Sequence, residues 1–458
     1  MKIKIRQNQL QGSALIVTLL TALIIGVALA SFLTLVSNQN RSNMHGMAWN
    51  ACIPMSEAGI EEALTQIRYN GITNLAANGW AWAADGLYHK SRVLGDGTSY
   101  EVTIKPVEPP IIVSRGTVPA PLGPASQVGM ILAQVVSPNS TATPPSVKRR
   151  IKVNTSRSTA FVGAMVAKGE IDLAGNNVST DSFDSSNPLY STNGKYDSAK
   201  SRDKGDVVTN SKLVNSLNVG NANIKGHIAT GPQGSVDIGP IGAVGSKAWI
   251  EGKNKGIQSG WSSDDMNLDI PDVQVPFTSG YSTPGGDTVG GTNYNYVLGT
   301  GNYKLSTLGG KVLVSGIASL WVTDSVAFTG QDYIYIGPSA SLMLYVSAAV
   351  AKIGGNGVIN SDANALSFQY FGLPSNTDVQ FNGNASYTGV VYAPQAQFSL
   401  GGGGNNTYDF LGASVSKTVK MNGHFNFHYD EAIPKKAFST GYVVIAWNEV
   451  DAYGEVRY

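Results

Sequence analysis

The chain has 458 residues, a formal net charge of +1 and charged side chains at only 14% of its positions. A balance this close to neutral creates no global field that would attract nucleic acid, so no nucleic-acid partner is expected. With 53 glycines and one cysteine, the chain should form two or three compact units rich in β-turns, without an intrachain disulfide.

The N-terminal segment predicts a membrane anchor. Residues 1–12 form a basic leader, and residues 13–40 carry no charged side chain. As a helix, the apolar run 14–36 would be about 34 Å long, which is enough to cross a bilayer. Basic residues on one side only place the N-terminus in the cytoplasm. We therefore expect a single-pass inner-membrane protein with a periplasmic or extracellular bulk and the lipid bilayer as a partner.

Three interpretations of this segment remain open. A secretory signal would be cleaved after Ala30, at the end of a small-residue Ala-Leu-Ala motif. A plain anchor would keep Met1. A prepilin-type segment would be cut after Gly12, ahead of the apolar helix, so that the mature chain would begin at Ser13. The apolar run continues well beyond Ala30, which favours the two interpretations that retain the helix.

Helix is expected to continue beyond the membrane, because apolar residues recur at helical spacing over residues 44–67. Two segments, 11–17 (QGSALIV) and 56–64 (SEAGIEEAL), resemble the N-terminal region of PilX-type minor pilins and K-type pseudopilins. The resemblance covers about residues 5–68. It implies one pilin-like helix over residues 13–70.

The resemblance also implies roles for residues near the leader. It implies cleavage between Gly12 and Ser13, and packing of the helix against other pilin-like subunits. Most pilins carry a glutamate at the fifth mature position, where this chain has Val17. K-type members share an uncharged residue there, and in them it accompanies a place at the fibre tip. Val17 equally fits a protein that stays in the membrane and never joins a fibre.

Residues 71–157 are predicted to form a small antiparallel β-region. Strands are expected at 100–107, 111–114, 130–136 and 150–154, separated by Pro- and Gly-rich turns. This sheet should cover the apolar stripe on the outer part of the helix. Trp80 and Trp82 are expected in that contact, with anchoring at the membrane interface as the alternative.

A glycine-rich repeat predicts a β-solenoid over residues 158–435. Four segments that begin at Gly163, Gly226, Gly389 and Gly412 share a strand, a sharp corner and a second strand closed by glycine. Apolar pairs recur 19 and 21 residues apart, which suits one three-strand coil: Val379/Phe381, Phe398/Leu400 and Val419/Met421.

The fold class expected is therefore mainly β: a pilin-like transmembrane α-helix, a small antiparallel sheet and a right-handed parallel β-helix. A β-sandwich is the alternative for the last part. Residues 160–450 also resemble an uncharacterised β-helical domain of bacterial surface proteins, which implies no known activity. Residues 436–458 are expected to add a C-terminal strand, with Trp447 covering the end of the solenoid core.

No complete catalytic or metal motif is found. No arginine occurs between Asp203 and Val456, although pectate-type lyases use one. An acidic cluster would fit a glycosidase pair or a calcium loop, but turns suit its spacing better: Asp264, Asp265, Asp269 and Asp272. A second polar group would fit zinc, but capping of the last coil is favoured: His424, His428, Asp430 and Glu431. We predict no catalytic residue, no cofactor and no metal.

Taken together, these features predict a non-catalytic, membrane-anchored surface protein. It would be a minor pilin or pseudopilin-like component of a type IV pilus or type II secretion-like system, presenting a β-helix for adhesion or assembly. Five tyrosines are candidates for a face that binds glycan or another surface: Tyr333, Tyr335, Tyr345, Tyr370 and Tyr387. The alternatives are a membrane-tethered carbohydrate-active enzyme and a simple anchored protein outside any fibre.

Overall fold

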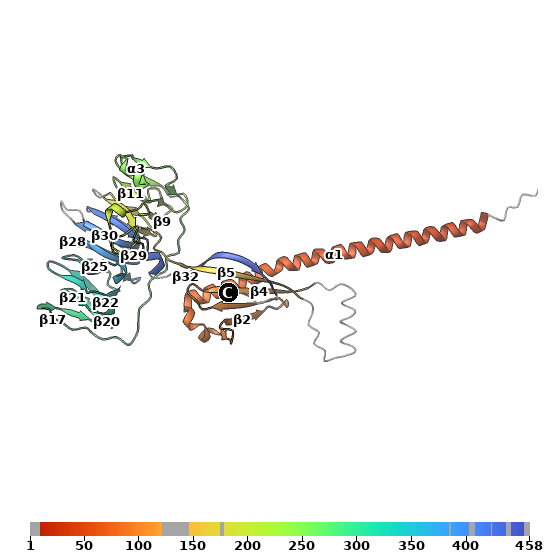
Figure 1. The fold of residues 1–458 in the computed structure, drawn as a ribbon, viewed down its shortest axis with the longest axis horizontal. Helices are drawn as coiled ribbons and strands as arrows, with labels where there is room; N and C mark the ends of the chain where they lie inside the picture. The colour runs from red at the N-terminus through yellow and green to blue at the C-terminus, as the bar shows by residue number, and fades with distance from the viewer. Residues whose placement is uncertain are drawn as a thin grey trace, which may run out of the picture. The chain divides into compact units, whose positions relative to one another are not determined.

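The computed structural model describes residues 10–120, 146–174, 178–383, 386–402, 408–422, 424–436 and 441–452 (Figure 1). The chain is mainly β with an N-terminal apolar helix, as predicted. It divides into two compact units: unit 1 contains Met1–Arg157 and Gly441–Tyr458, and unit 2 contains Ser158–Thr440. The strand predicted at 130–136 lies outside the described residues.

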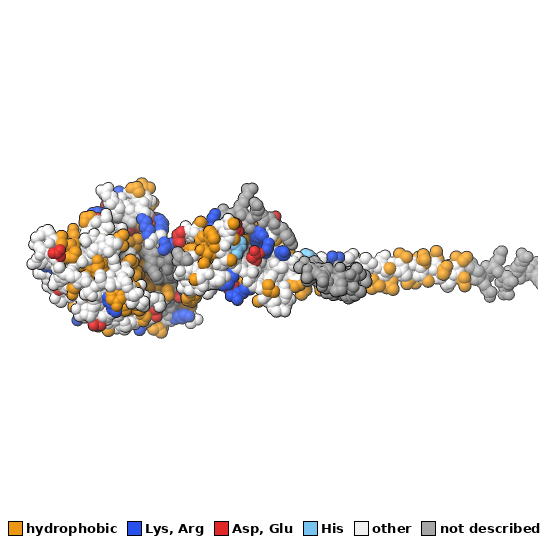
Figure 2. Space-filling model, turned by 90° about the horizontal axis from the view of Figure 1, so that it is seen from below, with side chains coloured by type: hydrophobic (Ala, Val, Ile, Leu, Met, Phe, Trp, Pro, Cys, Tyr) orange, Lys and Arg blue, Asp and Glu red, His pale blue; other side chains and the backbone are white. Residues whose placement is uncertain are grey.

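Helix α1 (Leu10–Asn70) is continuous, and its apolar first part is uncovered. Leu15 is 71% exposed and Val36 is 39% exposed. Figure 2 shows hydrophobic side chains along this part of the helix. The hydroxyls of Thr21 and Thr34 donate to carbonyls one turn back, so these polar groups are satisfied within the helix. Its length and apolar composition suffice to cross a bilayer, a test that a signal sequence would also pass.

The second part of α1 packs against the sheet of unit 1. Ile60 and Ala63 belong to a buried cluster that includes the inward residues of the sheet. The backbone N–H of Gly116 donates to Ser56 Oγ at 2.9 Å. A Cβ at Gly116 would collide with the carbonyl oxygen of Cys52, so glycine permits the close approach of helix and sheet.

The predicted apolar stripe is buried only in its later part. Met44 and Met47 are 50% and 72% exposed, whereas Ala48 is 8% exposed, so burial begins there. Trp80 is 2% exposed and joins the helix–sheet cluster, which confirms its predicted place. The prediction is wrong for Trp82, which is 57% exposed because it lies on the short edge strand β1.

Glu62 connects the helix to two strands of the sheet. Its carboxylate accepts hydrogen bonds from Arg92 Nε at 2.9 Å and from the Tyr100 hydroxyl at 2.6 Å, and Lys90 Nζ lies 3.1 Å away. The hydrogen bonds from Arg92 outweigh burial and, with Tyr100 and Lys90, lower the pKa of Glu62 to about 2. The charge on the helix is therefore fixed against the sheet.

The sheet of unit 1 has six strands in the order β1-β2-β3-β4-β5-β32. Their bounds are β1 (Ala81–Trp82), β2 (Tyr88–Val93), β3 (Ser99–Lys105), β4 (Ile111–Pro119), β5 (Ser146–Ser158) and β32 (Gly441–Val450). Two 3-10 turns, Ile72–Asn74 and Ala76–Asn78, connect the helix to the sheet. Strands β1 to β5 pair antiparallel in sequence, as predicted for this region.

The C-terminal strand differs from its prediction. Strand β32 lies beside β5 in unit 1 and does not close the core of unit 2, so the capping role given to Trp447 is wrong. Arg149 Nη2 on β5 lies 2.6 Å from Glu449 Oε2, and the Tyr442 hydroxyl donates to Glu108 at 2.7 Å. The open edge of β5 offers backbone partners, and these side chains hold the strand there.

Unit 2 is built from three ladders of parallel strands and a four-stranded parallel sheet. In order of pairing, ladder A contains β20 (Gly301–Leu308), β22 (Ile317–Phe328), β24 (Ser341–Val346), β27 (Phe368–Gly372), β29 (Tyr387–Gly402), β30 (Tyr408–Met421), β6 (Met165–Ala167), β9 (Val207–Thr209), β12 (Ile228–Ala229) and β16 (Ser262–Ser263). Ladder B contains the later residues of β22, then β25 (Val350–Ile353), β28 (Asp378–Gly383), the later residues of β29 and β30, β7 (Ile171–Asp172), β10 (Leu217–Gly220) and β13 (Val236–Ile238).

Ladder C continues from the first residues of β30. It contains β31 (Phe425–Asp430), β8 (Ser179–Phe183), β11 (Asn223–Lys225), β14 (Ala243–Gly245) and β15 (Gly256–Ile257). The separate parallel sheet contains β19 (Tyr296–Leu298), β21 (Lys311–Val314), β23 (Tyr333–Ile336) and β26 (Val358–Asn360). The short helices are α3 (Lys247–Glu251) and α4 (Ile433–Lys436), two 3-10 turns are Ser198–Lys200 and Ala365–Ser367, and β17 (Asp287–Val289) and β18 (Thr292–Tyr294) form a hairpin.

The predicted 19- and 21-residue spacing is confirmed by the register. Val379 pairs with Phe398, and Phe398 pairs with Val419. Inward residues of successive strands therefore stack in columns, including an aromatic column of Phe381, Tyr387, Phe410 and Phe427 with centroids 4.2–5.1 Å apart. Parallel pairing of short strands does not fit the β-sandwich alternative, which is antiparallel.

The first strands of unit 2 stack on its last strands. Strand β30 pairs with β6 and β7, and β31 pairs with β8, which joins residues about 250 positions apart; we call this junction the seam (Figure 1). Strand β31 thus has a partner on each side, β30 and β8. The capping role predicted for His428, Asp430 and Glu431 is therefore wrong, because β31 is an internal strand.

A segment without regular strands, residues 264–286, returns along the outer side of ladder A. The backbone N–H of Met266 donates to the carbonyl of Thr230, which follows β12. The backbone N–H of Ser282 donates to the carbonyl of Asn302 on β20, at the other end of ladder A. The acidic cluster predicted in this segment does not gather as a unit. Asp272 contacts Lys168 and Gln395, at 3.4 and 2.8 Å.

Candidate functional site at the seam

The five candidate tyrosines do not form one face. Tyr370 is completely buried and Tyr387 is 4% exposed, so the prediction of a ligand surface is wrong for both; they fill the aromatic interior. Tyr333 and Tyr335 lie on β23, half-buried, whereas Tyr345 lies on β24 in ladder A and stacks on a phenylalanine ring of β27. The structure therefore places the tyrosines on different parts of unit 2.

The residues assigned to processing and fibre packing lie in the first turns of α1. Gly12 and Ser13 are inside the bounds of the helix, and Val17 is 57% exposed. An uncovered apolar side chain at this position is available to lipid or to another helix. Cleavage and packing remain predictions.

The densest buried polar group of unit 2 lies at the seam. In the parallel register His428 stands beside Asp181, and Phe427 stands beside Thr180. Because side chains alternate along a strand, Phe427 points into the core while His428 points outward. The loop between β8 and β9 covers it, with the Tyr196 ring stacked on the imidazole at 3.8 Å. His428 and Asp181 are each only 5% exposed as a result.

Two carboxylates contact the His428 ring, one on each nitrogen. Nδ1 lies 2.5 Å from Asp181 Oδ1, and Nε2 lies 3.4 Å from Asp409 Oδ1. The Tyr196 hydroxyl donates to the other oxygen of Asp181 at 2.8 Å, and Asn426 donates to Asp409 at 3.1 Å. Burial lowers the pKa of His428, but the hydrogen bonds to Asp181 and Asp409 outweigh burial and raise it above its usual value.

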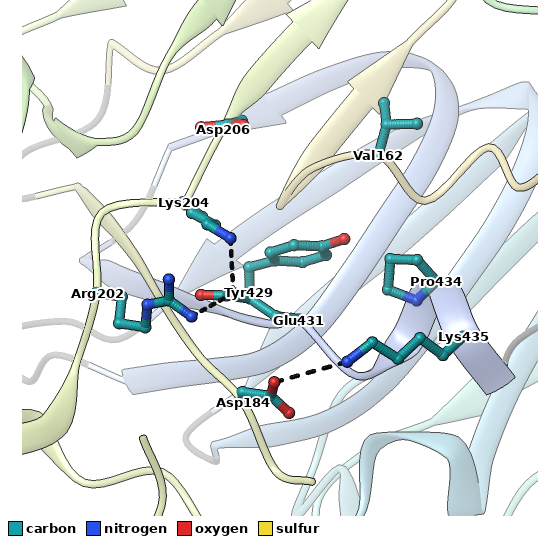
Figure 3. A pocket seen from close by; sticks show the side chains of 9 residues that line it. All are labelled: Val162, Asp184, Arg202, Lys204, Asp206, Tyr429, Glu431, Pro434 and Lys435. Atoms are coloured by element: carbon teal, nitrogen blue, oxygen red, sulfur yellow. Dashed lines mark hydrogen bonds and ion pairs between the residues drawn. The ribbon is translucent and has the colours of Figure 1, made fainter. Parts of the chain in front are cut away.

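A pocket of about 340 Å³ opens beside this group (Figure 3). Its lining comes from both sides of the seam: Val162, Asp184, Arg202, Lys204, Asp206, Tyr429, Glu431, Pro434 and Lys435. Arg202 and Lys204 reach Glu431 at 2.8 and 3.2 Å, and Lys435 lies 3.8 Å from Asp184. Dashed lines in Figure 3 mark these ion pairs, which join Glu431 to Arg202 and Lys204, and Asp184 to Lys435.

The acids of the pocket stand in different environments. Glu431 faces two cations and accepts a hydrogen bond from Ser182 Oγ at 2.9 Å. Burial raises the pKa of Asp206, although the backbone N–H of His227 donates to it at 2.7 Å. The two acids therefore differ in burial and in their charged neighbours. Among the described residues, no group of three or more His, Cys, Asp or Glu side chains is placed to hold a metal ion.

The sequence identified half of the site. The spacing of His424, His428, Asp430 and Glu431 indicates a polar group but does not indicate its partners. Asp181 and Tyr196 lie more than 200 residues away in sequence, and only the stacking of first strands on last strands brings them together. His424 precedes β31, where its carbonyl accepts a hydrogen bond from the backbone of Tyr408.

Comparison with known proteins gives limited matches. A family model described as a domain of unknown function (DUF7305) matches residues 277–435, a part of unit 2. A solved structure, the competence-associated pilin ComZ from Thermus thermophilus, is similar with 10% sequence identity and a TM-score of 0.23, covering 88% of this chain and 97% of that chain. A TM-score this low carries no argument about fold or function. No curated protein matches significantly.

Proposed function

We propose that the chain is a non-catalytic, membrane-anchored surface protein that acts as a minor pilin or pseudopilin-like subunit. The observation that carries the proposal is helix α1. Its first part is apolar and uncovered, whereas its second part packs against an antiparallel sheet of the same unit. An apolar rod of this length is unstable in water, and lipid or neighbouring helices would cover it.

In this proposal residues 14–36 cross the inner membrane, with the basic leader in the cytoplasm. Other pilin-like subunits pack against the same helix, as the resemblance to PilX-type and K-type proteins implies. Val17 presents no charge to a neighbouring amine. This suits a place at a fibre tip in a type IV pilus or a type II secretion-like system.

Unit 2 would be the part that is displayed. Its three ladders of parallel strands support a right-handed parallel β-helix, because inward side chains stack in register from strand to strand. Such a solenoid is rigid and offers long outer faces. We propose that these faces serve adhesion, to a glycan or another surface, or contact with assembly partners.

The mature N-terminus tests this proposal directly. Mass spectrometry of the protein purified from membranes of a cell with a prepilin peptidase should find an N-methylated chain that begins at Ser13. Gly12→Leu should retain the leader, while the matched control Ala30→Leu should be processed normally. A mature chain that begins at residue 31, together with loss of this cleavage in Ala30→Leu, would overturn the pilin-like assignment.

A second candidate function, glycoside hydrolysis, is favoured by the unlike acids of the seam pocket. Asp206, whose pKa burial raises, would act as the proton donor, and Glu431, which faces Arg202 and Lys204, as the second carboxylate. Reducing-sugar release from a panel of polysaccharides tests it. Release that disappears in Asp206→Asn and persists in the matched control Asp184→Asn would establish the enzyme. We expect no release from the unmodified chain.

A further inference from the structure

The seam differs chemically from the other steps of the ladders. Elsewhere, successive strands come from neighbouring parts of the chain, and apolar residues such as Phe398 and Val419 lie side by side. The seam has such apolar pairs too, with Val419 beside Ile171, but between β31 and β8 it also pairs His428 with Asp181, far apart in sequence. This junction therefore contains an ionisable pair that is almost inaccessible to water.

We propose that His428 is a protonation-controlled clasp, whose imidazolium joins Asp181 on β8 to Asp409 on β30 and so holds the first strands of unit 2 onto the last. The inference concerns unit 2 alone and does not depend on whether α1 joins a fibre. It gives the displayed unit two states, with the seam closed and with the seam opened.

The need for a proton follows from the ring itself. A neutral imidazole has one N–H, so it can donate to one carboxylate only and must turn a lone pair toward the other. Asp181 lies at Nδ1 and Asp409 at Nε2, so only the imidazolium can donate to both. Loss of the proton turns a lone pair of the buried ring toward one carboxylate, which costs free energy. Asp181 is 5% exposed and cannot regain a donor from water, whereas the Asp409 side chain is 44% exposed and keeps its hydrogen bond from Asn426.

The other charged and titratable groups do not substitute for His428. The loop above the ring contributes Tyr196, whose hydroxyl already donates to Asp181. On β31 itself, Asp430 accepts from the backbone N–H groups of Ser185 and Ala432. Beyond β31, Glu431 is paired with cations of the neighbouring loop, Arg202 and Lys204. None of these groups supplies a second donor to Asp409 when the imidazole is neutral.

The direction of the pH effect follows from the raised pKa of His428. A group whose pKa is higher in the closed state stabilises that state fully below its unfolded value of about 6.5, and the effect disappears as pH rises through the raised pKa. The seam should therefore be tight in mildly acidic surroundings and should loosen in alkaline ones. Between the two pKa values, the opening constant rises by up to about tenfold per pH unit.

Hydrogen exchange of the full chain in detergent micelles, from about pH 5.5 to 9 and corrected for intrinsic rates, tests the clasp. Protection of seam peptides from β8 and β31 should fall about tenfold or more across the transition, while peptides of β24 keep theirs. His428→Gln should remove the pH-dependent change. The matched control His227→Gln, at an exposed histidine 3.5 Å from Asp206 and 52% exposed at its side chain, should keep it.

A second variant keeps the test decisive if His428→Gln does not fold. Asp409→Asn retains an acceptor at Nε2 but removes one negative charge, so the midpoint should move to lower pH with the protein still folded. Seam protection that does not vary with pH in the unmodified chain would overturn the proposal. An unshifted midpoint in Asp409→Asn, or an unchanged transition in His428→Gln, would overturn it as well.

Discussion

In both units a strand pairs with one from a distant part of the chain, but the side chains that join the two strands are exposed to water in unit 1 and buried in unit 2. In unit 1, β32 joins β5 through Arg149 and Glu449 at the margin of the sheet, where the Glu449 side chain is 38% exposed. In unit 2, β31 joins β8 through His428 and Asp181, which are buried. Water weakens an exposed ion pair, whereas a buried pair depends strongly on its protonation.

The two units obtain their stability from different contacts. Unit 1 depends on one helix–sheet interface, with Glu62 as a half-buried charge. Unit 2 depends on columns of inward side chains, such as Phe410 of β30 and Phe427 of β31, whose ring centroids lie 4.4 Å apart.

The largest effect is expected from Phe410→Ala in the aromatic column. Phe410 is completely buried and stacks on both Tyr387 and Phe427, so truncation leaves a cavity that rigid neighbours cannot fill. We expect a loss of about 4 kcal/mol in the free energy of unfolding of unit 2. Denaturant unfolding with hydrogen exchange on β29 and β30 measures it. The control Phe410→Leu should lose less than half as much, and equal losses would argue against a packed column.

The helix–sheet interface of unit 1 should be nearly as sensitive at Gly116. A Cβ there meets the carbonyl of Cys52 and the side chains of Ser56 and Met55, so Gly116→Val must push the helix from the sheet. We expect a loss of about 3 kcal/mol in the stability of unit 1. Thermal unfolding measures it, with Gly95→Ala as control, because nothing lies within 4 Å of a Cβ at that position. A stable Gly116→Val chain would mean that the close approach is not required.

How much of this was predictable depends on how far apart the contacting residues lie in sequence. Helical spacing predicted α1, and the distance from Val379 to Phe398 predicted the register of ladder B, because both patterns are local. The place of β32 and the pairing of His428 with Asp181 were not predictable. A strand that closes a solenoid and a strand that joins a remote sheet have the same sequence pattern. The alternation of side chains determines which residues lie on each face of the strand, but it does not determine the neighbouring strand.

Acid should destabilise unit 1 through Glu62. Its pKa falls to about 2 beside Arg92, so the stabilisation is complete above the unfolded value of about 4.3 and is lost as pH falls toward 2. We expect Glu62→Gln to cost about 2 kcal/mol at pH 7 and to flatten the acid limb of unit 1 stability. Unfolding measured from pH 2 to 7 tests this, with the exposed Glu61→Gln as control. If the stability of unit 1 still falls steeply in acid in Glu62→Gln, other carboxylates cause the loss.

The smallest effect is expected from Glu449→Gln, which removes the ion pair that fastens β32 to β5. Arg149 would keep a neutral acceptor and its contact with the Trp49 ring at 4.9 Å, and water already reaches Glu449. We expect a loss of only about 0.5 kcal/mol in unit 1, reduced further by salt. Hydrogen exchange of the β32 amides in low and high salt measures it. A loss as large as that of Glu62→Gln would show that the Arg149–Glu449 pair stabilises unit 1 as strongly as a buried ion pair. The contrast between the two units would then disappear.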